Sequence, residues 1–323
     1  MNQLFDLREA FTLTLLELAR VDSRVCIVLN DSLSSSNAKA FLDEFPERLF
    51  DVGIAEQNMV GVAAGLANSG LIPFVCAASC FLTGRALEQI KVDVALNNAN
   101  VKLCGFSSGF AYGSLGATHH AIEDIAWTRV LPRLQVVVPC DDIEIAGVVK
   151  AAYEHQGPVF IRVNRIPVPR LYCNGQKFEF GAATCLRDGR DLTLIGFGLT
   201  THRVLAAAEL LSEHGIECRV LNMSSVSPLD SMAIDSACRD TKRIVCVEDH
   251  QLVGGLFSAV AETVVQRTPV PVLGIGVPGV FAPVSNTEEL LELFGFGSQQ
   301  IAKRVLQWLG DVDKNFKIQT KCT

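Results

Sequence analysis

The sequence predicts an α/β protein built from two open, mostly parallel, doubly wound sheets. The chain has 323 residues, of which 49% are hydrophobic. Short apolar or β-branched runs alternate with helical patterns along its whole length, which is typical of parallel strands covered by helices on both faces. One proline-rich, polar stretch interrupts this alternation, and the length suits two domains of ordinary size.

Nine strands are expected, in two series. The first series is VCIVLN near residue 25, IPFVC near 72, VKLCGF near 101, LQVVVP near 134 and PVFIRV near 158. The second is DLTLIGFG near 191, IECRVLNM near 216, RIVCVED near 243 and PVPVLGIGV near 269. The segment between them, RIPVPRLYCNGQKFEFG, is typical of a linker because of its prolines and polar residues. We therefore predict domains at residues 1–175 and 176–323.

Composition and charge point away from several functional classes. The chain carries 28 basic and 35 acidic residues, a formal net charge of -7, and no run of lysines or arginines, so neither nucleic acid nor a membrane surface is expected as a partner. The N-terminal MNQLFDLREAF lacks a basic region followed by an apolar one. We expect a soluble, cytoplasmic protein that acts on a small molecule or with another protein.

The cysteines indicate buried, reduced thiols. Their number is odd, 11, no two of them form a C-x-x-C pair, and most lie in apolar runs such as VCIVL and RIVCV. This pattern favours neither a zinc-binding site nor disulfide bonds.

The stretch DVGIAEQNMVGVAAGLANSG places one carboxylate, Glu56, at the start of an apolar helix. The helical spacing of apolar residues is carried by Ala55, Met59, Val62, Ala63 and Leu66. A carboxyl group held in dry surroundings has its acid form favoured, which suits acid–base chemistry. The alternative is a structural role of Glu56 at the helix N-terminus, where acidic residues are favoured.

Other candidate site residues lie at expected strand ends or helix starts, where open α/β sheets bind ligands. They are Arg8, Ser36, His119 with His120, and Arg165.

Each of these candidates also has a structural alternative. Arg8 has Glu9 and Glu44 as possible ion-pair partners, Ser36 is suited to capping the helix that follows, and Arg165 to anchoring the linker. The two histidines follow a turn and precede a helix, where a capping role is equally consistent with the pattern.

Four segments, in order, resemble the second and third domains of transketolases. They are GIAEQNMVGVAAGLA, PFVCAASCFLTGRALEQIK, GATHHAIEDIAWTRVLPRLQVVVPCDDIE and VEDHQLVGGLFSAVAE. The resemblance extends from Arg8 to about residue 310 and is greatest to the C-terminal subunit of split bacterial transketolases, which consist of two chains. It implies a pyrimidine-binding domain for thiamine diphosphate followed by a transketolase C-terminal domain. The implied activity, known from pentose phosphate metabolism, transfers a two-carbon ketol unit from a phosphorylated ketose to an aldose phosphate.

The same resemblance assigns roles to the candidate residues. Glu56 corresponds to the glutamate that hydrogen-bonds N1′ of the cofactor's aminopyrimidine, so that the ring can remove the C2 proton of the thiazolium. Phe81 corresponds to the aromatic residue packed on that ring, and His119 to the histidine that faces the reacting carbonyl. The positions for the substrate phosphate fall on Arg8, Ser36 and Arg165.

The chain departs from the family pattern at four positions. Ser107 stands in place of a histidine, Leu115 in place of an aspartate that reads a sugar hydroxyl, Ser32 in place of an aspartate, and Ala78 in place of an aromatic residue. A site that has lost hydrogen-bonding groups discriminates less between hydroxyl configurations. The pattern favours an atypical or branched ketose, with apulose 4-phosphate as one precedent in the family.

The resemblance also implies a second polypeptide. Transketolases hold the diphosphate and its Mg²⁺ or other divalent cation through a domain with a GDG motif, and the sequence contains no GDG. We expect a larger N-terminal subunit to supply it in an α2β2 assembly, and no metal site in this chain. The helix with Gly61 and Gly65 is a candidate interface.

Two other functions remain open at this point. The first is the β subunit of a 2-oxo acid dehydrogenase E1 component, which has similar domains and a glutamate in the same role. It resembles the chain less, because IAEQN, GATHH and the set of Arg8, Ser36 and Arg165 are typical of transketolases. The second is a non-catalytic partner subunit whose active site has decayed, an idea that the four departures favour and the retention of Glu56, Phe81 and His119 opposes.

Overall fold

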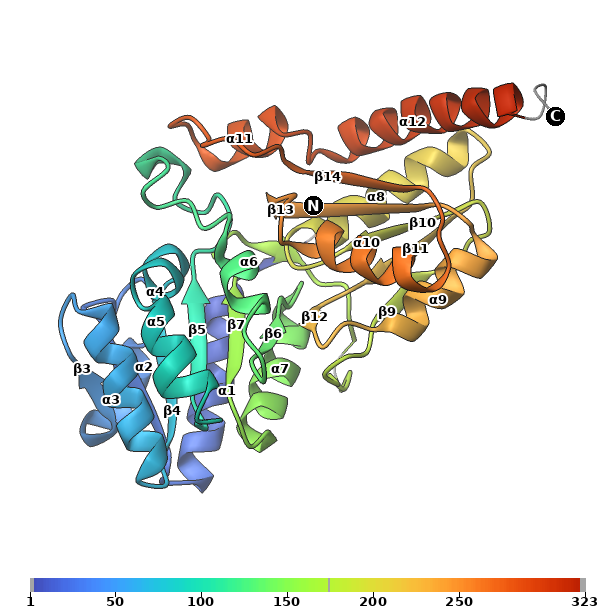
Figure 1. The fold of residues 1–323 in the computed structure, drawn as a ribbon. Helices are drawn as coiled ribbons and strands as arrows, with labels where there is room; N and C mark the ends of the chain where they lie inside the picture. The colour runs from blue at the N-terminus through green and yellow to red at the C-terminus, as the bar shows by residue number, and fades with distance from the viewer. Residues whose placement is uncertain (1–2, 174, 320–323) are drawn as a thin grey trace.

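The computed structural model describes residues 3–173 and 175–319, the side chains as far as residue 312, and forms two sheet units side by side (Figure 1). The first sheet has seven strands in the order β12-β6-β7-β5-β4-β2-β3. Neighbouring strands in this sheet pair in parallel, except β12 and β6, which are antiparallel. The strands are β2 (Val25–Leu29), β3 (Leu49–Asp51), β4 (Ile72–Ala78), β5 (Lys102–Phe106), β6 (Gln135–Val137), β7 (Val159–Val163) and β12 (Ser225–Ser227).

Helices cover both faces of this sheet. Ile27 and Leu29 of β2 belong to the same apolar core as α1 and α7, whereas Val28 belongs to the core that includes α3, as the alternation of side chains along a strand requires. The helices are α1 (Leu7–Val21), α2 (Lys39–Glu44), α3 (Glu56–Asn68), α4 (Ser79–Arg85), α5 (Leu87–Gln89), α6 (Asp124–Arg129) and α7 (Asp142–Glu154). Short turns of other helix types are η1 (Pro46–Arg48), η2 (Ile90–Ala95) and η3 (Gly113–Leu115).

The second sheet has five strands in the order β14-β13-β10-β11-β9, parallel except for β9. They are β9 (Thr184–Arg187), β10 (Leu192–Gly196), β11 (Cys218–Asn222), β13 (Ile244–Gln251) and β14 (Val272–Val277). The helices of this unit are α8 (Thr200–Glu213), α9 (Ser231–Asp240), α10 (Leu256–Arg267), α11 (Thr287–Leu293) and α12 (Ser298–Gln319). A separate pair, β1 (Leu4–Phe5) and β8 (Val168–Pro169), is antiparallel.

The predicted fold class is confirmed, and every predicted strand is present. Five strands were not predicted: β1, β3, β8, β9 and β12. Of these, β12 comes from the second half of the chain yet pairs with β6 of the first sheet, so the two halves share a sheet edge. No helix within the described residues is long and apolar enough to cross a membrane.

The thiol prediction also agrees with the structure. The ten described cysteines are free, and seven of them are buried. Burial raises the pKa of the Cys26 thiol to about 12, and a thiol that stays protonated at neutral pH is chemically inert.

A buried charge cluster joins the two units. The guanidinium of Arg162, on β7, donates through Nε to Asp124 at 3.0 Å and through Nη1 to Asp249 of β13 at 2.7 Å. Its Nη2 donates to the carbonyl oxygens of Ala121 and Asp249. Burial alone lowers the pKa of Arg162, but the two carboxylates raise it above its ordinary value, so the side chain stays charged.

A glycine is required where the loop after β5 meets this cluster. Gly109 has a φ of +61°, and a Cβ placed on it would lie 2.0 Å from Oδ2 of Asp249. Any other residue would be strained and would collide with the carboxylate.

Replacing Arg162 with methionine should lower the free energy of unfolding by about 3–5 kcal/mol, because it leaves two buried carboxylates without their cation. The measurement is urea denaturation followed by circular dichroism. The control is Arg20→Met, which removes an exposed ion pair with Glu44 and should leave the urea midpoint nearly unchanged. Equal midpoints for the two variants would contradict the role given to Arg162.

Candidate active site

The candidate residues of the first unit gather at the carboxyl ends of four adjacent strands. In the order β2-β4-β5-β7, the chain leaves these strands toward Asn30, Phe81, His119 and Arg165, respectively. Parallel strands bring their carboxyl ends to one edge of the sheet, and ligands of open α/β sheets bind there. Glu56 reaches the same edge from the first turn of α3.

Glu56 begins α3, as predicted, and its side chain is only 3% exposed. The buried face of the helix is formed by Met59, Val60, Ala63 and Ala64. Val62 and Leu66, which the apolar spacing also placed inward, are only partly buried.

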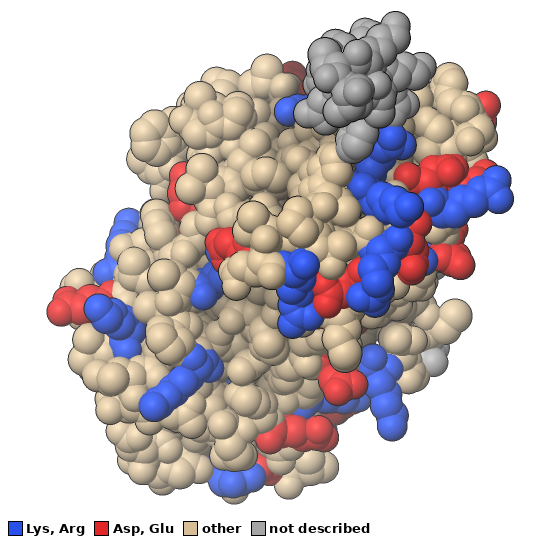
Figure 2. All heavy atoms as spheres, turned by 45° about the vertical axis from the view of Figure 1, so that its right-hand side comes forward, with Lys and Arg blue, Asp and Glu red and all other residues tan. Residues whose placement is uncertain are grey.

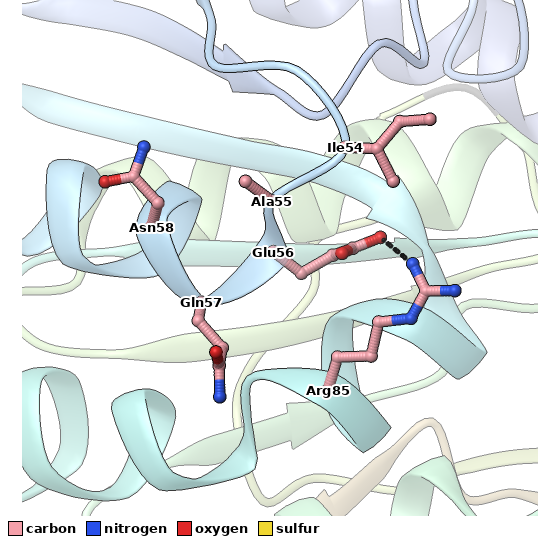
Figure 3. A pocket seen from close by; sticks show the side chains of 6 residues that line it. All are labelled: Ile54, Ala55, Glu56, Gln57, Asn58 and Arg85. Atoms are coloured by element: carbon pink, nitrogen blue, oxygen red, sulfur yellow. Dashed lines mark hydrogen bonds and ion pairs between the residues drawn. The ribbon is translucent and has the colours of Figure 1, made fainter.

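The surroundings of Glu56 are more polar than the sequence led us to expect. Its Oε1 accepts a hydrogen bond from Nδ2 of Asn30 at 2.9 Å and an ion-paired hydrogen bond from Nη1 of Arg85 at 2.8 Å. Figure 3 shows the Glu56 and Arg85 side chains pointing toward one another. A cation and an amide donor therefore both contact this carboxyl group, and its surroundings are polar rather than the apolar pocket that the sequence predicted.

A cavity of about 560 Å³ opens beside this pair, a size common for small-molecule sites. It is lined by Ile54, Ala55, Glu56, Gln57, Asn58 and Arg85. Next to it, Oδ1 of Asn30 is buried without a hydrogen-bond partner among the described residues. Buried polar atoms are nearly always bonded, so an unsatisfied acceptor beside a carboxylate fits a heteroaromatic ring that carries donors.

Cations and rings form a continuous line from Glu56 to Arg165. The Arg85 guanidinium lies over the Phe81 ring, 3.9 Å from its centroid. Phe81 meets the His119 ring edge-on at 5.0 Å between centroids. His119 in turn contacts Tyr112 at 6.0 Å, and the Arg165 guanidinium lies 5.4 Å from the Tyr112 centroid.

The structure separates the two neighbouring histidines. His119 is partly exposed, and its Nδ1 shares a hydrogen bond with the Thr118 hydroxyl at 2.9 Å. His120 is 3% exposed, contacts the carbonyl oxygen of Gly113 through Nε2 at 3.2 Å, and packs on Phe110. Burial lowers the pKa of His120, which suits a neutral structural group, whereas His119 belongs to the line of rings.

Arg8 and Ser36 lie near each other but are already bonded within the chain. Nη2 of Arg8 donates to Oδ2 of Asp6 at 2.6 Å. Its Nη1 donates to the carbonyl oxygen of Ser35 at 3.4 Å. The buried Ser36 hydroxyl donates to that of Ser32 at 3.2 Å.

Neither structural alternative weighed for these two residues is found. The carboxylate partner of Arg8 is Asp6, and Glu44 pairs with Arg20 instead. The helix after Ser36 begins at Lys39 with Ala38 as its N-cap residue.

The four atypical positions border the same edge of the sheet. Ser107 directly follows β5 with a φ of +55°, and its buried hydroxyl has no partner among the described residues. Leu115 is 51% exposed. Ser32 donates to the carbonyl oxygen of Cys76, and Ala78 ends β4.

Sequence reasoning missed three residues at the site: Asn30, Arg85 and Tyr112. Asn30 follows a fully buried strand, which is the signal that could have found it. Arg85 lies four residues after Phe81 on α4, a spacing that places both on one helix face. Tyr112 sits in a loop, where only the tertiary structure reveals its neighbours.

Charge on the visible surface is mixed. On the face in Figure 2, basic and acidic side chains are interspersed rather than grouped by sign. Among the side chains that the structure describes, in residues 3–173 and 175–312, no three His, Cys, Asp or Glu residues lie where they could hold a metal ion.

Comparison with known proteins identifies both halves of the chain. The family described as "Transketolase, pyrimidine binding domain" matches residues 3–170, and "Transketolase, C-terminal domain" matches residues 181–301.

Individual relatives agree with these matches. The chain is 43% identical to a subunit of the apulose-4-phosphate transketolase of Phocaeicola vulgatus, over 95% of this chain and 99% of the relative. It is 36% identical to a 6-deoxy-6-sulfo-D-fructose transketolase subunit of a Clostridium species, over 94% of this chain and 96% of the relative. A solved structure titled "Split gene transketolase, inactive beta4 tetramer" superposes with a TM-score of 0.85 at 38% identity, covering 93% of this chain and 96% of that one.

Proposed function

The chain belongs to the transketolase family, and from this premise we propose that it is the C-terminal subunit of a split, thiamine-diphosphate-dependent transketolase. The reaction transfers a two-carbon ketol unit from a phosphorylated ketose to an aldose phosphate. The observation that carries the proposal is the continuous line of groups from Glu56 through Phe81 and His119 to Arg165. It provides, in order, an acid–base group, a ring-packing surface, a group for the sugar carbonyl and a cation for the phosphate.

The residues of this chain fit the cofactor's aminopyrimidine. When bound, thiamine diphosphate supplies the electron sink that carbon–carbon cleavage needs. Glu56 holds or gives a proton at ring nitrogen N1′, Phe81 packs on the ring, and the unsatisfied Oδ1 of Asn30 offers an acceptor beside it. His119 donates a hydrogen bond to the sugar carbonyl, where negative charge develops.

The basic residues suit the phosphate of the sugar. Guanidinium groups bind phosphate dianions through paired, charge-assisted hydrogen bonds. Arg165 projects from the end of β7, and Arg8 lies beside the Ser35 backbone. Because Arg8 is ion-paired with Asp6, a phosphate must compete with that carboxylate, and Ser36 must exchange its hydrogen bond to Ser32.

We propose that the sugar is atypical, as the names of the relatives suggest. One is an apulose-4-phosphate transketolase subunit and another a 6-deoxy-6-sulfo-D-fructose transketolase subunit. Here Leu115 projects half-exposed from the loop that carries His119. Its apolar side chain cannot accept a hydrogen bond from a sugar hydroxyl, so it tolerates branched or modified sugars.

A larger N-terminal subunit with a GDG motif is the proposed partner, in an α2β2 assembly. It would bind the diphosphate and most of the shell of Mg²⁺ or another divalent cation. The related split-gene structure is titled an inactive β4 tetramer, which supports activity only with a partner. On α3, a Cβ added to Gly61 or Gly65 would meet nothing of this chain within 4 Å, so this face is open for close packing.

The remaining predictions belong to this proposal. The boundary near residue 175 divides a pyrimidine-binding domain from a C-terminal domain, and reduced thiols suit a cytoplasmic location. Neither the β subunit of a 2-oxo acid dehydrogenase nor a non-catalytic partner is favoured over a transketolase subunit, given the relatives and the intact line of groups at the site.

Glu56→Ala should lower ketol transfer by about 10²–10⁴-fold in the reconstituted pair, because the cofactor loses its proton partner. Assembly, measured by analytical ultracentrifugation, should be unaffected. The matched control is Glu213→Ala, at the exposed end of α8, which should keep full activity. Unchanged turnover of the Glu56 variant would make the chain a scaffold rather than a catalytic subunit.

Arg165→Ala should raise KM for phosphorylated sugars about 10- to 100-fold with a smaller effect on kcat, since hydrogen bonds to charged groups contribute about 1.5–3 kcal/mol. Steady-state kinetics with matched phosphorylated and neutral sugars test this. The KM for the neutral sugar should not change in this way. An equal rise in KM for both sugars would exclude a phosphate-binding role.

Leu115→Asp should shift preference toward an ordinary ketose phosphate, about tenfold in the ratio of kcat/KM values for xylulose 5-phosphate and a branched ketose phosphate, because it restores a hydroxyl acceptor. Leu115→Asn offers a neutral acceptor as a comparison. If the unmodified pair already prefers xylulose 5-phosphate over every branched or modified sugar, the proposed sugar class is wrong.

A further inference from the structure

Arg85 makes both contacts that the proposed cofactor ring requires. Its guanidinium stacks over Phe81 at 3.9 Å and donates to Oε1 of Glu56 at 2.8 Å. The aminopyrimidine would pack on the same phenylalanine and bond to the same carboxylate. A guanidinium is planar, stacks on aromatic faces and donates in-plane hydrogen bonds, so it can occupy the place of such a ring.

We propose that Arg85 holds the position of the aminopyrimidine in the cofactor-free chain and is displaced from Glu56 when thiamine diphosphate binds. The inference rests on the proposed function, because it takes Glu56 and Phe81 as the cofactor's partners. Arg85 is then neither a cofactor ligand nor a catalytic residue. It is an internal competitor that keeps the site ordered until the cofactor arrives.

The burial of Glu56 explains why a competitor is present. The carboxylate is 3% exposed, and its other bond on Oε1 comes from the neutral amide of Asn30. A buried charge without a compensating partner is strongly destabilising. Before assembly, the Arg85 cation supplies that compensation.

The position of Arg85 makes its departure easy. Its side chain is 47% exposed, so part of it is already in contact with solvent. It is the last residue of α4, lines the cavity, and points toward Glu56 (Figure 3). A rotation of one long side chain therefore frees both Phe81 and Glu56 without moving the helix.

The test measures cofactor binding to the assembled, cofactor-free complex by isothermal titration calorimetry in the absence of sugar. Arg85→Ala removes the competitor, so the Kd for thiamine diphosphate should fall about tenfold, a change of about 1.4 kcal/mol. Arg85→Lys keeps the charge but loses the planar group, so its Kd should lie between those of the unmodified complex and the Arg85→Ala variant. The control, Arg239→Ala, removes an exposed arginine of α9 in the other unit and should leave the Kd unchanged.

An unchanged or weaker affinity of the Arg85→Ala variant overturns the proposal, because Arg85 would then be indifferent to the cofactor or a ligand of it. A structure of the complex with thiamine diphosphate gives a second readout. It should show Arg85 beyond hydrogen-bond distance of Glu56, and a retained ion pair overturns the proposal as well. If Glu56→Ala abolishes ketol transfer while Arg85→Ala leaves the affinity unchanged, only the role of Arg85 fails; if Glu56→Ala keeps full activity, the proposed function fails first.

Discussion

Arg162 places a positive charge at the junction of the two sheets, in contact with Asp124 at the start of α6 and Asp249 on β13. A buried cation is tolerable only when carboxylates and carbonyl oxygens surround it, and these come here from both halves of the chain. The loop from β5 to α6, which carries His119, is fixed by the same cluster, since Ala121 accepts from Arg162 and Gly109 lies against Asp249. The distance of His119 from Phe81 therefore depends on a charge pair outside the site.

Two of the charged residues at the site already have a partner of opposite charge within the chain. Arg8 is paired with Asp6, and Glu56 with Arg85. Under the proposed function, an anionic sugar at Arg8 or a cofactor ring at Glu56 would exchange one partner for another instead of meeting an unpaired charge. Such exchange limits the gain in affinity but keeps the empty site folded, which suits a subunit that must meet its partner before it can act.

The sequence predicted the strands well because buried parallel strands are continuous apolar runs, as in VCIVL and VFIRV. The missed strands have two to four residues, too few to show a period, and β12 pairs across the two halves of the chain. Glu56 was placed in the first turn of its helix because apolar spacing is local. Its ion pair with Arg85 was not foreseen, since 29 residues separate the two in the chain.

What the sequence determined by itself was the family, the order of the strands along the chain and the candidate residues that gather at one edge of the first sheet. These follow from local patterns and from ordered motifs. What only the tertiary structure decided was which side chains are already paired: Arg8 with Asp6, Arg85 with Glu56, and His120 with the backbone instead of the site. The physical reason is that hydrogen bonds and ion pairs act over a few ångströms, and separation along the chain does not specify separation in space.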